Sequence, residues 1–273
     1  MSPLAHQRFG RRALLGSLGL AAVGAAVGGP VVASRLADAA THKPPVPPKV
    51  PGTLWSPDIP TAGLKIFEDV EDDRAHTDAG TRHIYPVGDA IRFDMNMKVR
   101  DTLSGRQRNE AVGMRQNGQI LQMLPGQTWR LAWDLFIPAT LRATTSFTHI
   151  HQLKMPGTGS APIFVMSLRL RRGKPTIETQ VAYKGIHVGD TPLAPLQDRW
   201  IHTEFEYGVA NNGHVRWTLT DGAQTVIDVT RPNVDLFMAS RTRPKWGIYR
   251  SLGDRADLRD CYLLTRNFTG SVH

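Results

Sequence analysis

The sequence predicts an all-β domain, a jelly-roll β-sandwich of two antiparallel sheets with a groove on the concave sheet. Three observations favour this fold. Helical periodicity is nearly absent beyond the N-terminal region, apolar and polar residues alternate with a period of two, and the alternating segments are short and separated by Gly, Pro, Asn and Asp. Residues that alternate with the core positions should line the groove.

The clearest strand is 89–101, where five apolar residues alternate with five charged or polar ones. In the segment 128–138 the residues predicted to face inward are Trp129, Leu131, Trp133, Leu135 and Ile137. Asn212-Gly213 is a strong hairpin turn. The remaining predicted strands are 162–170, 176–183, 200–209, 215–219, 226–229, 245–250 and 261–267, and the segments 233–240 and 139–143 suggest short helical turns.

The N-terminus predicts an export signal. Arg11-Arg12 precede a charge-free run of small and apolar residues from 13 to 34, and Ala37-Asp38-Ala39 has the spacing that a signal peptidase uses. The twin arginine indicates a Tat-type signal over residues 1–40, which exports folded proteins. The run is long enough to remain as a membrane anchor, but its glycines and the cleavage site favour removal. We therefore expect a secreted protein with no stable membrane association after cleavage.

Residues 41–52 are rich in proline and predict a stiff linker, and 53–273 is one domain's worth of chain. Cys261 is the single cysteine, so no internal disulfide can form, and a domain of this size can bury enough core without one. The formal net charge of +9 suits an anionic polysaccharide partner. The basic residues are spread along strand-like segments, so nucleic acid has no specific support. We expect a monomer.

The first candidate group for chemistry lies on a cation-rich strand. Arg106, Arg108 and Glu110 share one face of this strand. Two guanidinium groups beside a carboxylate can hold each other and still present donors to a substrate carboxylate. A solvated charged strand face is the plainer alternative.

The second candidate group is a histidine pair, His149 and His151, which a regular strand places on one face. Such a pair can ligate a metal or supply a proton acceptor near neutral pH. Surface histidines are the alternative. A zinc site needs further ligands, and nothing in the spacing of His187, His202 and His214 calls for one, so no metal is predicted.

The stretch 244–250 is the one around which the site is predicted. On a strand, Lys245, Gly247 and Tyr249 share one face, and the two residues between them are apolar and buried on the other. Gly247 leaves room for a ligand against the backbone. A cation beside a phenol can hold an anionic sugar and move a proton. An ordinary edge strand with a solvated Lys is the alternative.

Together these segments resemble the conserved motifs of jelly-roll polysaccharide lyases. The motifs are Arg108-Asn109-Glu110, His149-Ile150-His151 and Lys245-Trp246-Gly247-Ile248-Tyr249. They are similar to the Arg-x-Glu, Gln-Ile-His and Lys-x-Gly-x-Tyr strands of alginate lyases, and Gly-Ile-Tyr-Arg also resembles the heparin-lyase-like and glucuronan-lyase-like branches. The chain departs from the alginate-lyase pattern at Val112, His149 and Ser251, which argues against a plain alginate lyase.

The resemblance implies β-elimination at a 4-linked uronic acid in glucuronan or a related polyuronate. Arg108 and His149 would offset the charge on the C6 carboxyl group, with Glu110 orienting Arg108. Tyr249 would protonate the leaving oxygen, and either His151 or Tyr249 itself would be the base. The residues expected to bind substrate are Arg106, Glu110, Lys245 and Arg250. No cofactor is implied; calcium occurs in some relatives, but no Asp-rich loop here demands it.

Two other classes of protein remain open from the sequence. A carbohydrate-binding jelly roll without catalysis would keep a basic or aromatic groove and would tolerate loss of His151 and Tyr249. A glycoside hydrolase of similar fold would need two carboxylates across the cleft. Because the groove residues are mainly cations, the hydrolase ranks last.

Overall fold

The computed structural model describes residues 52–157, 161–238 and 240–273. The signal predicted over 1–40 lies outside these residues, as does the linker predicted over 41–52 apart from Gly52. None of the helices in the described residues has both the length and the apolar character needed to cross a bilayer.

Strands account for most of the described chain. One group comprises β1 (Thr53–Trp55), β3 (Ile84–Val87), β4 (Ala90–Met95), β8 (Thr128–Phe136), β13 (Trp200–Gly208), β14 (Gly213–Asp221), β15 (Gln224–Val234) and β17 (Cys261–Val272). A second comprises β2 (Asp69–Asp72), β5 (Arg106–Val112), β9 (Thr148–Lys154), β10 (Phe164–Arg171), β11 (Lys174–Val181), β12 (Ile186–Pro192) and β16 (Arg243–Ser251). The rest are the hairpin β6 (Met114–Gln116) and β7 (Gln119–Leu121), the helix α2 (Ile59–Ala62) and the 3-10 turns η1 (Gly63–Ile66), η2 (Ala182–Lys184), η3 (Ala194–Leu196) and η4 (Arg255–Asp257).

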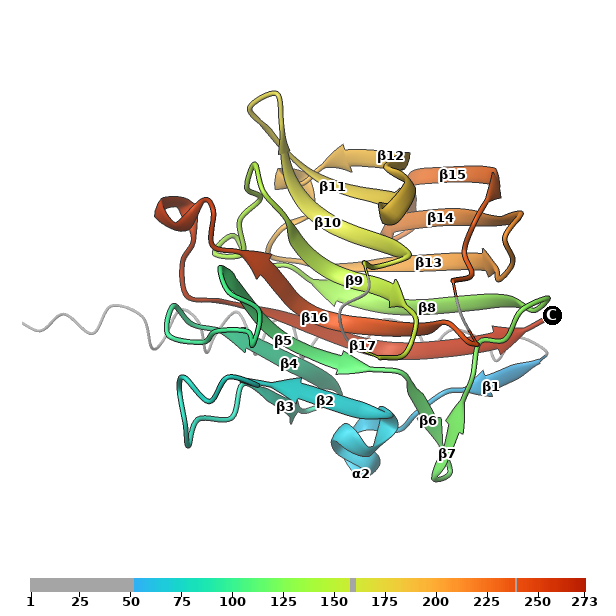
Figure 1. The fold of residues 1–273 in the computed structure, drawn as a ribbon, viewed down its shortest axis with the longest axis horizontal. Helices are drawn as coiled ribbons and strands as arrows, with labels where there is room; N and C mark the ends of the chain where they lie inside the picture. Colours follow the sequence, from blue (N-terminus) through green and yellow to red (C-terminus); the bar gives the residue numbers. More distant parts are fainter. Residues whose placement is uncertain (1–51, 158–160, 239) are drawn as a thin grey trace, which may run out of the picture. The chain divides into compact units, whose positions relative to one another are not determined.

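The first and second groups of strands form two antiparallel sheets that pack as a sandwich (Figure 1). The eight-stranded sheet has the order β15-β14-β13-β8-β17-β4-β3, with β1 also paired to β17. The seven-stranded sheet has the order β12-β11-β10-β9-β16-β5-β2. The prediction of an all-β jelly-roll sandwich is confirmed. The order places β16 between β9 and β5, so three segments that are distant in sequence become neighbours.

Two local predictions are wrong for identifiable reasons. The strand predicted over 89–101 ends at Met95, because the Asn96 side chain accepts hydrogen bonds from the Lys98 and Val99 amides and turns the chain. The described residues of 233–240 are not helical: β15 continues as an edge strand to Val234, and 235–238 follow it without regular structure.

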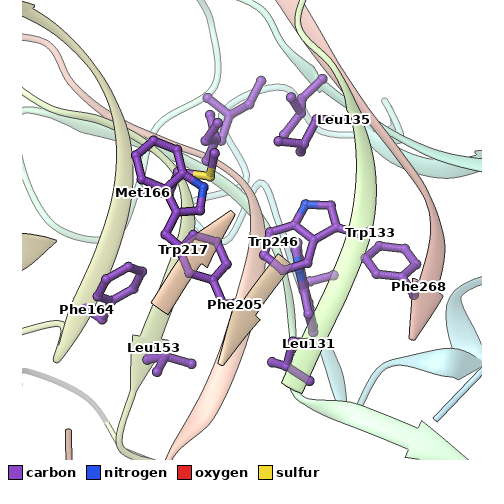
Figure 2. Packing of buried hydrophobic residues seen from close by; sticks show 14 of the residues in the cluster. Leu131, Trp133, Leu135, Leu153, Phe164, Met166, Phe205, Trp217, Trp246 and Phe268 are labelled. Atoms are coloured by element: carbon purple, nitrogen blue, oxygen red, sulfur yellow. The ribbon is translucent and has the colours of Figure 1, made fainter. Parts of the chain in front are cut away.

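The core lies between the sheets and is rich in aromatic side chains (Figure 2). The five residues predicted to face inward from 128–138 are all buried. Trp133 of β8 meets Trp246 of β16 edge-on, with ring centroids 5.8 Å apart. Burying a Leu or Phe side chain of this core contributes about 1.5–3 kcal/mol. The burial of Trp246 and Ile248 in this core directs Lys245 and Tyr249 to the opposite face of β16.

An irregularity in β9 changes which residues reach that opposite face. His151 pairs with Met166 of β10, and His149 pairs with the next residue, Ser167, so Ile150 is an extra residue in β9. Ile150 and His151 both turn into the core, as a β-bulge allows. The bulge shifts the alternation, and the next outward side chain is Gln152.

Candidate active site

The outer face of the seven-stranded sheet carries a groove with a volume of about 820 Å³. It is lined by residues of β2, β5, β9 and β16 and of the loops beside them. The described residues that line it are Asp69, Val70, Glu71, Arg74, Thr102, Leu103, Arg106, Arg108, Phe147, His149, Gln152, Lys154, Gly157, Ala161, Pro162, Arg243, Lys245 and Tyr249. Five of the predicted site residues line this groove: Arg106, Arg108, His149, Lys245 and Tyr249. A sixth, Glu110, lies directly beneath the groove surface and contacts Lys245.

Tyr249 lies where three strands meet. Its direct cross-strand neighbours are Arg108 on β5 and His149 on β9. Arg106 donates a hydrogen bond from Nη1 to the Tyr249 hydroxyl. The Arg108 guanidinium carbon lies 4.0 Å from the centroid of the Tyr249 ring. The predicted convergence of guanidinium, imidazole and phenol is therefore present.

His149 is held as a neutral imidazole. Its Nδ1 lies 2.7 Å from the Ser167 hydroxyl, and its ring stacks on Phe147 with centroids 4.6 Å apart. Burial, reinforced by the positive charges of nearby arginines including Arg108, lowers the pKa of His149 to about 3. In neutral solution His149 can donate or accept a hydrogen bond, but it carries no charge.

Lys245 and Arg108 are fixed by carboxylates. The Lys245 Nζ lies 2.5 Å from Glu71 Oε2 and 2.9 Å from Glu110 Oε2. Arg108 contacts Asp101 at 3.0 Å, Glu71 at 3.1 Å and Glu110 at 3.5 Å. Burial disfavours the charged guanidinium, but these carboxylates raise the pKa of Arg108 overall. Both cations are held in place.

His151 does not reach the groove, and the prediction that it shares a face with His149 is wrong. The β9 bulge turns it into the core, where its ring centroid is 4.6 Å from that of Trp133 and its Nε2 is 3.0 Å from the Tyr207 hydroxyl. Burial lowers the pKa of His151 to about 3. This position does not suit the base role expected for it.

Arg250 also lies away from the groove, so its assignment to substrate binding is corrected. Its Nε donates to the Gln107 side chain at 2.7 Å, and Nη1 donates to the Arg259 carbonyl at 3.0 Å. Arg250 follows Tyr249 along β16, so strand alternation turns it to the other face.

Gly247 has a different role from the predicted one. Its φ is +131°, and a Cβ at this position would overlap the carbonyl oxygen of Asn109. The glycine allows the backbones of β16 and β5 to approach each other closely, rather than making room for a ligand.

Several residues that line the groove were not predicted from the sequence. Gln152, which donates to Glu110, was hidden by the bulge, because regular alternation places it in the core. Lys154 is half-buried near Lys245, and its pKa is lowered to about 8, first by burial and then by the neighbouring cations. Glu71 belongs to a four-residue edge strand with no apolar pattern that would have marked it.

The described residues contain no group of three or more His, Cys, Asp and Glu side chains placed to hold a metal ion.

Comparison with known proteins supports the fold. No family model and no curated protein matches the chain. An alginate lyase from Pseudomonas aeruginosa is similar in structure, with 16% identity, 77% of this chain and 98% of that chain covered, and a TM-score of 0.50. An endo-β-1,4-glucuronan lyase from the fungus Trichoderma reesei has 11% identity over 81% of this chain and 92% of that one, with a TM-score of 0.46. A family 7 alginate lyase from Zobellia galactanivorans has 13% identity over 76% and 93%, with a TM-score of 0.47.

The molecule thus has the jelly-roll fold found in polysaccharide lyases. At this level of identity the similarity concerns the fold alone.

Proposed function

We propose that this protein is an exported polysaccharide lyase that cleaves a 4-linked, uronic-acid-containing polysaccharide by β-elimination. One observation carries the proposal: Arg108, Tyr249 and His149 are cross-strand neighbours in a groove, and Arg106 donates to the phenol. The expected substrate is an anionic polysaccharide, and the chain is expected to act as a monomer.

The reaction needs a base, an acid and stabilisation of developing charge. The base takes the C5 proton, the electron pair forms the C4–C5 double bond, and the C4–O4 bond breaks as O4 gains a proton. With His151 in the core, Tyr249 is the group placed to do both tasks. Its phenolate takes the C5 proton and passes it to O4 when both lie on the same side of the ring, as in glucuronate or mannuronate.

The surrounding groups then have defined tasks. Arg106 stabilises negative charge on the phenolic oxygen to which it donates. His149, as a neutral donor, and Arg108, as a fixed positive charge, offset the charge that develops on the C6 carboxyl group. Glu110 fixes Lys245 and helps to orient Arg108.

A substrate panel tests this proposal. Glucuronan, alginate, heparin and hyaluronan are incubated with the protein, and the ultraviolet absorbance of unsaturated uronate is followed. We expect at least one polymer to yield absorbing products. Binding to these polymers with no new absorbance would instead favour the carbohydrate-binding alternative.

Export is supported by the Arg11-Arg12 motif and the small residues at 37–39. We expect the mature N-terminus near residue 40 in the medium. Replacing both arginines by lysine should retain the protein inside the cell. Unchanged secretion of that variant would contradict Tat export.

A further inference from the structure

The two ends of the groove differ in how their cations are partnered. Glu71 pairs with Glu110 across β2 and β5, and Glu110 pairs with Gly247, which precedes Tyr249 by two residues on β16. Two residues correspond to about 7 Å along a strand. This end of the groove, the Lys245 end, therefore meets a neighbouring sugar when the reacting sugar lies at Tyr249. At the Lys245 end, Nζ lies between two carboxylates, 2.5 Å from Glu71 and 2.9 Å from Glu110.

Glu71 is a permanent anion at this end. Burial favours its neutral form, but Lys245 and Arg108 lower the pKa of Glu71 overall. Its carboxylate is 2.5 Å from Lys245, 3.1 Å from Arg108 and 3.3 Å from Arg74. The position where a substrate carboxylate would meet Lys245 is already occupied by a carboxylate of the protein.

Arg106, at the Tyr249 end, has a different kind of partner. It donates to the Tyr249 hydroxyl, and no described carboxylate forms an ion pair with it. Arg243, which also lines the groove, is paired with Glu68 at 3.1 Å. Arg106 is therefore a lining guanidinium that remains available to a substrate carboxylate next to the reacting phenol.

We propose that Glu71 determines specificity by limiting the groove to one carboxylated sugar at the Tyr249 end, with an uncharged sugar beside it at the Lys245 end. Hydroxyl groups of a neutral sugar can donate to Glu71 and accept from Lys245. A second uronate would place its carboxylate against Glu71 and Glu110, which costs affinity. The substrate class is then a heteropolysaccharide in which uronic acid alternates with a neutral sugar, rather than the polyuronate favoured by the sequence. This inference rests on the proposed function.

Two polymers that share the reacting sugar test the proposal. Every sugar of glucuronan carries a carboxylate, whereas in hyaluronan 4-linked glucuronate alternates with an uncharged amino sugar. We expect wild-type kcat/KM to be higher on hyaluronan than on glucuronan. We expect Glu71→Gln to raise the glucuronan-to-hyaluronan ratio of kcat/KM by tenfold or more.

Asp69→Asn is the matched control. Asp69 is on the same strand and lines the same groove, but it is exposed and makes no ion pair with Lys245 or Arg108. It should change the ratio by less than threefold. Equal changes of this kcat/KM ratio in the two variants would overturn the proposal. A higher wild-type kcat/KM on glucuronan than on hyaluronan would also overturn it, and that measurement does not require the Glu71 variant to fold.

If neither polymer is cleaved, the proposed function fails on these substrates, and affinity electrophoresis still decides the inference. Wild-type protein should be retarded more by hyaluronan than by glucuronan, and Glu71→Gln should reduce that difference. Equal retardation of the wild-type protein by both polymers would overturn the inference.

Discussion

At the scale of single residues, the chemistry of the groove depends on how each side chain is partnered. His149 acts in this account as a neutral hydrogen-bonding group, because its pKa is lowered to about 3. We expect His149→Gln, which can still donate, to lose about tenfold in kcat/KM, and His149→Ala to lose about 100-fold or more. Steady-state kinetics on the best substrate of the panel measure both. Equal losses would show that His149 is not needed as a donor.

His151 should govern stability rather than catalysis. Its folded pKa of about 3 lies below the ordinary value of about 6.5 in the unfolded chain, so the unfolded state binds more protons between these values. The free energy of unfolding therefore falls as the pH is lowered, by about 2 kcal/mol for this histidine between pH 7 and pH 5.

Denaturant titrations at pH 7 and pH 5 measure this effect. His151→Gln, which keeps a hydrogen-bonding group beside Tyr207, should lower stability at pH 7 but flatten the pH dependence. Its kcat should stay within threefold of the wild-type value. A variant that folds but is inactive would restore His151 to a role in the reaction.

The two misplaced site residues differ in how far the sequence could have placed them. Arg250 follows Tyr249 directly, so strand alternation alone puts it on the other face. The position of His151 could not be predicted in this way, because a bulge has no signature in the residues around Ile150.

At the scale of elements, the β16–β5 pair depends on Gly247. Its φ of +131° and the closeness of the Asn109 carbonyl oxygen leave no room for a side chain at this position. We expect Gly247→Ala to destabilise the fold by about 2 kcal/mol or more and to reduce activity by moving Tyr249.

Gly222→Ala is the control for this prediction. Gly222 also has a positive φ, +58°, but an added Cβ there meets nothing within 4 Å. It should cost about 1 kcal/mol and leave activity unchanged. Equal destabilisation of the two variants in urea unfolding would contradict the close-approach argument.

At the scale of the whole molecule, the alternating pattern was sufficient to predict the sandwich, because buried faces of strands such as β8 require one apolar residue in every two. The order of the strands was not predictable in the same way. Placing β16 between β9 and β5 depends on long-range packing, such as that of Trp246 on Trp133, which local periodicity does not encode. The ion pair between Glu71 and Lys245 also depends on that order, because the pairing of β2 with β5 brings Glu71 to Lys245.

The most direct test of the central claim is digestion of the best panel substrate in water enriched in heavy oxygen, with mass spectrometry of the products. Elimination breaks the C4–O4 bond without adding water, so wild-type products should carry a C4–C5 double bond and no label from cleavage. Tyr249→Phe, with its fold verified by circular dichroism, should form no such product. Label incorporated at each cleavage, or full activity of Tyr249→Phe, would contradict the account.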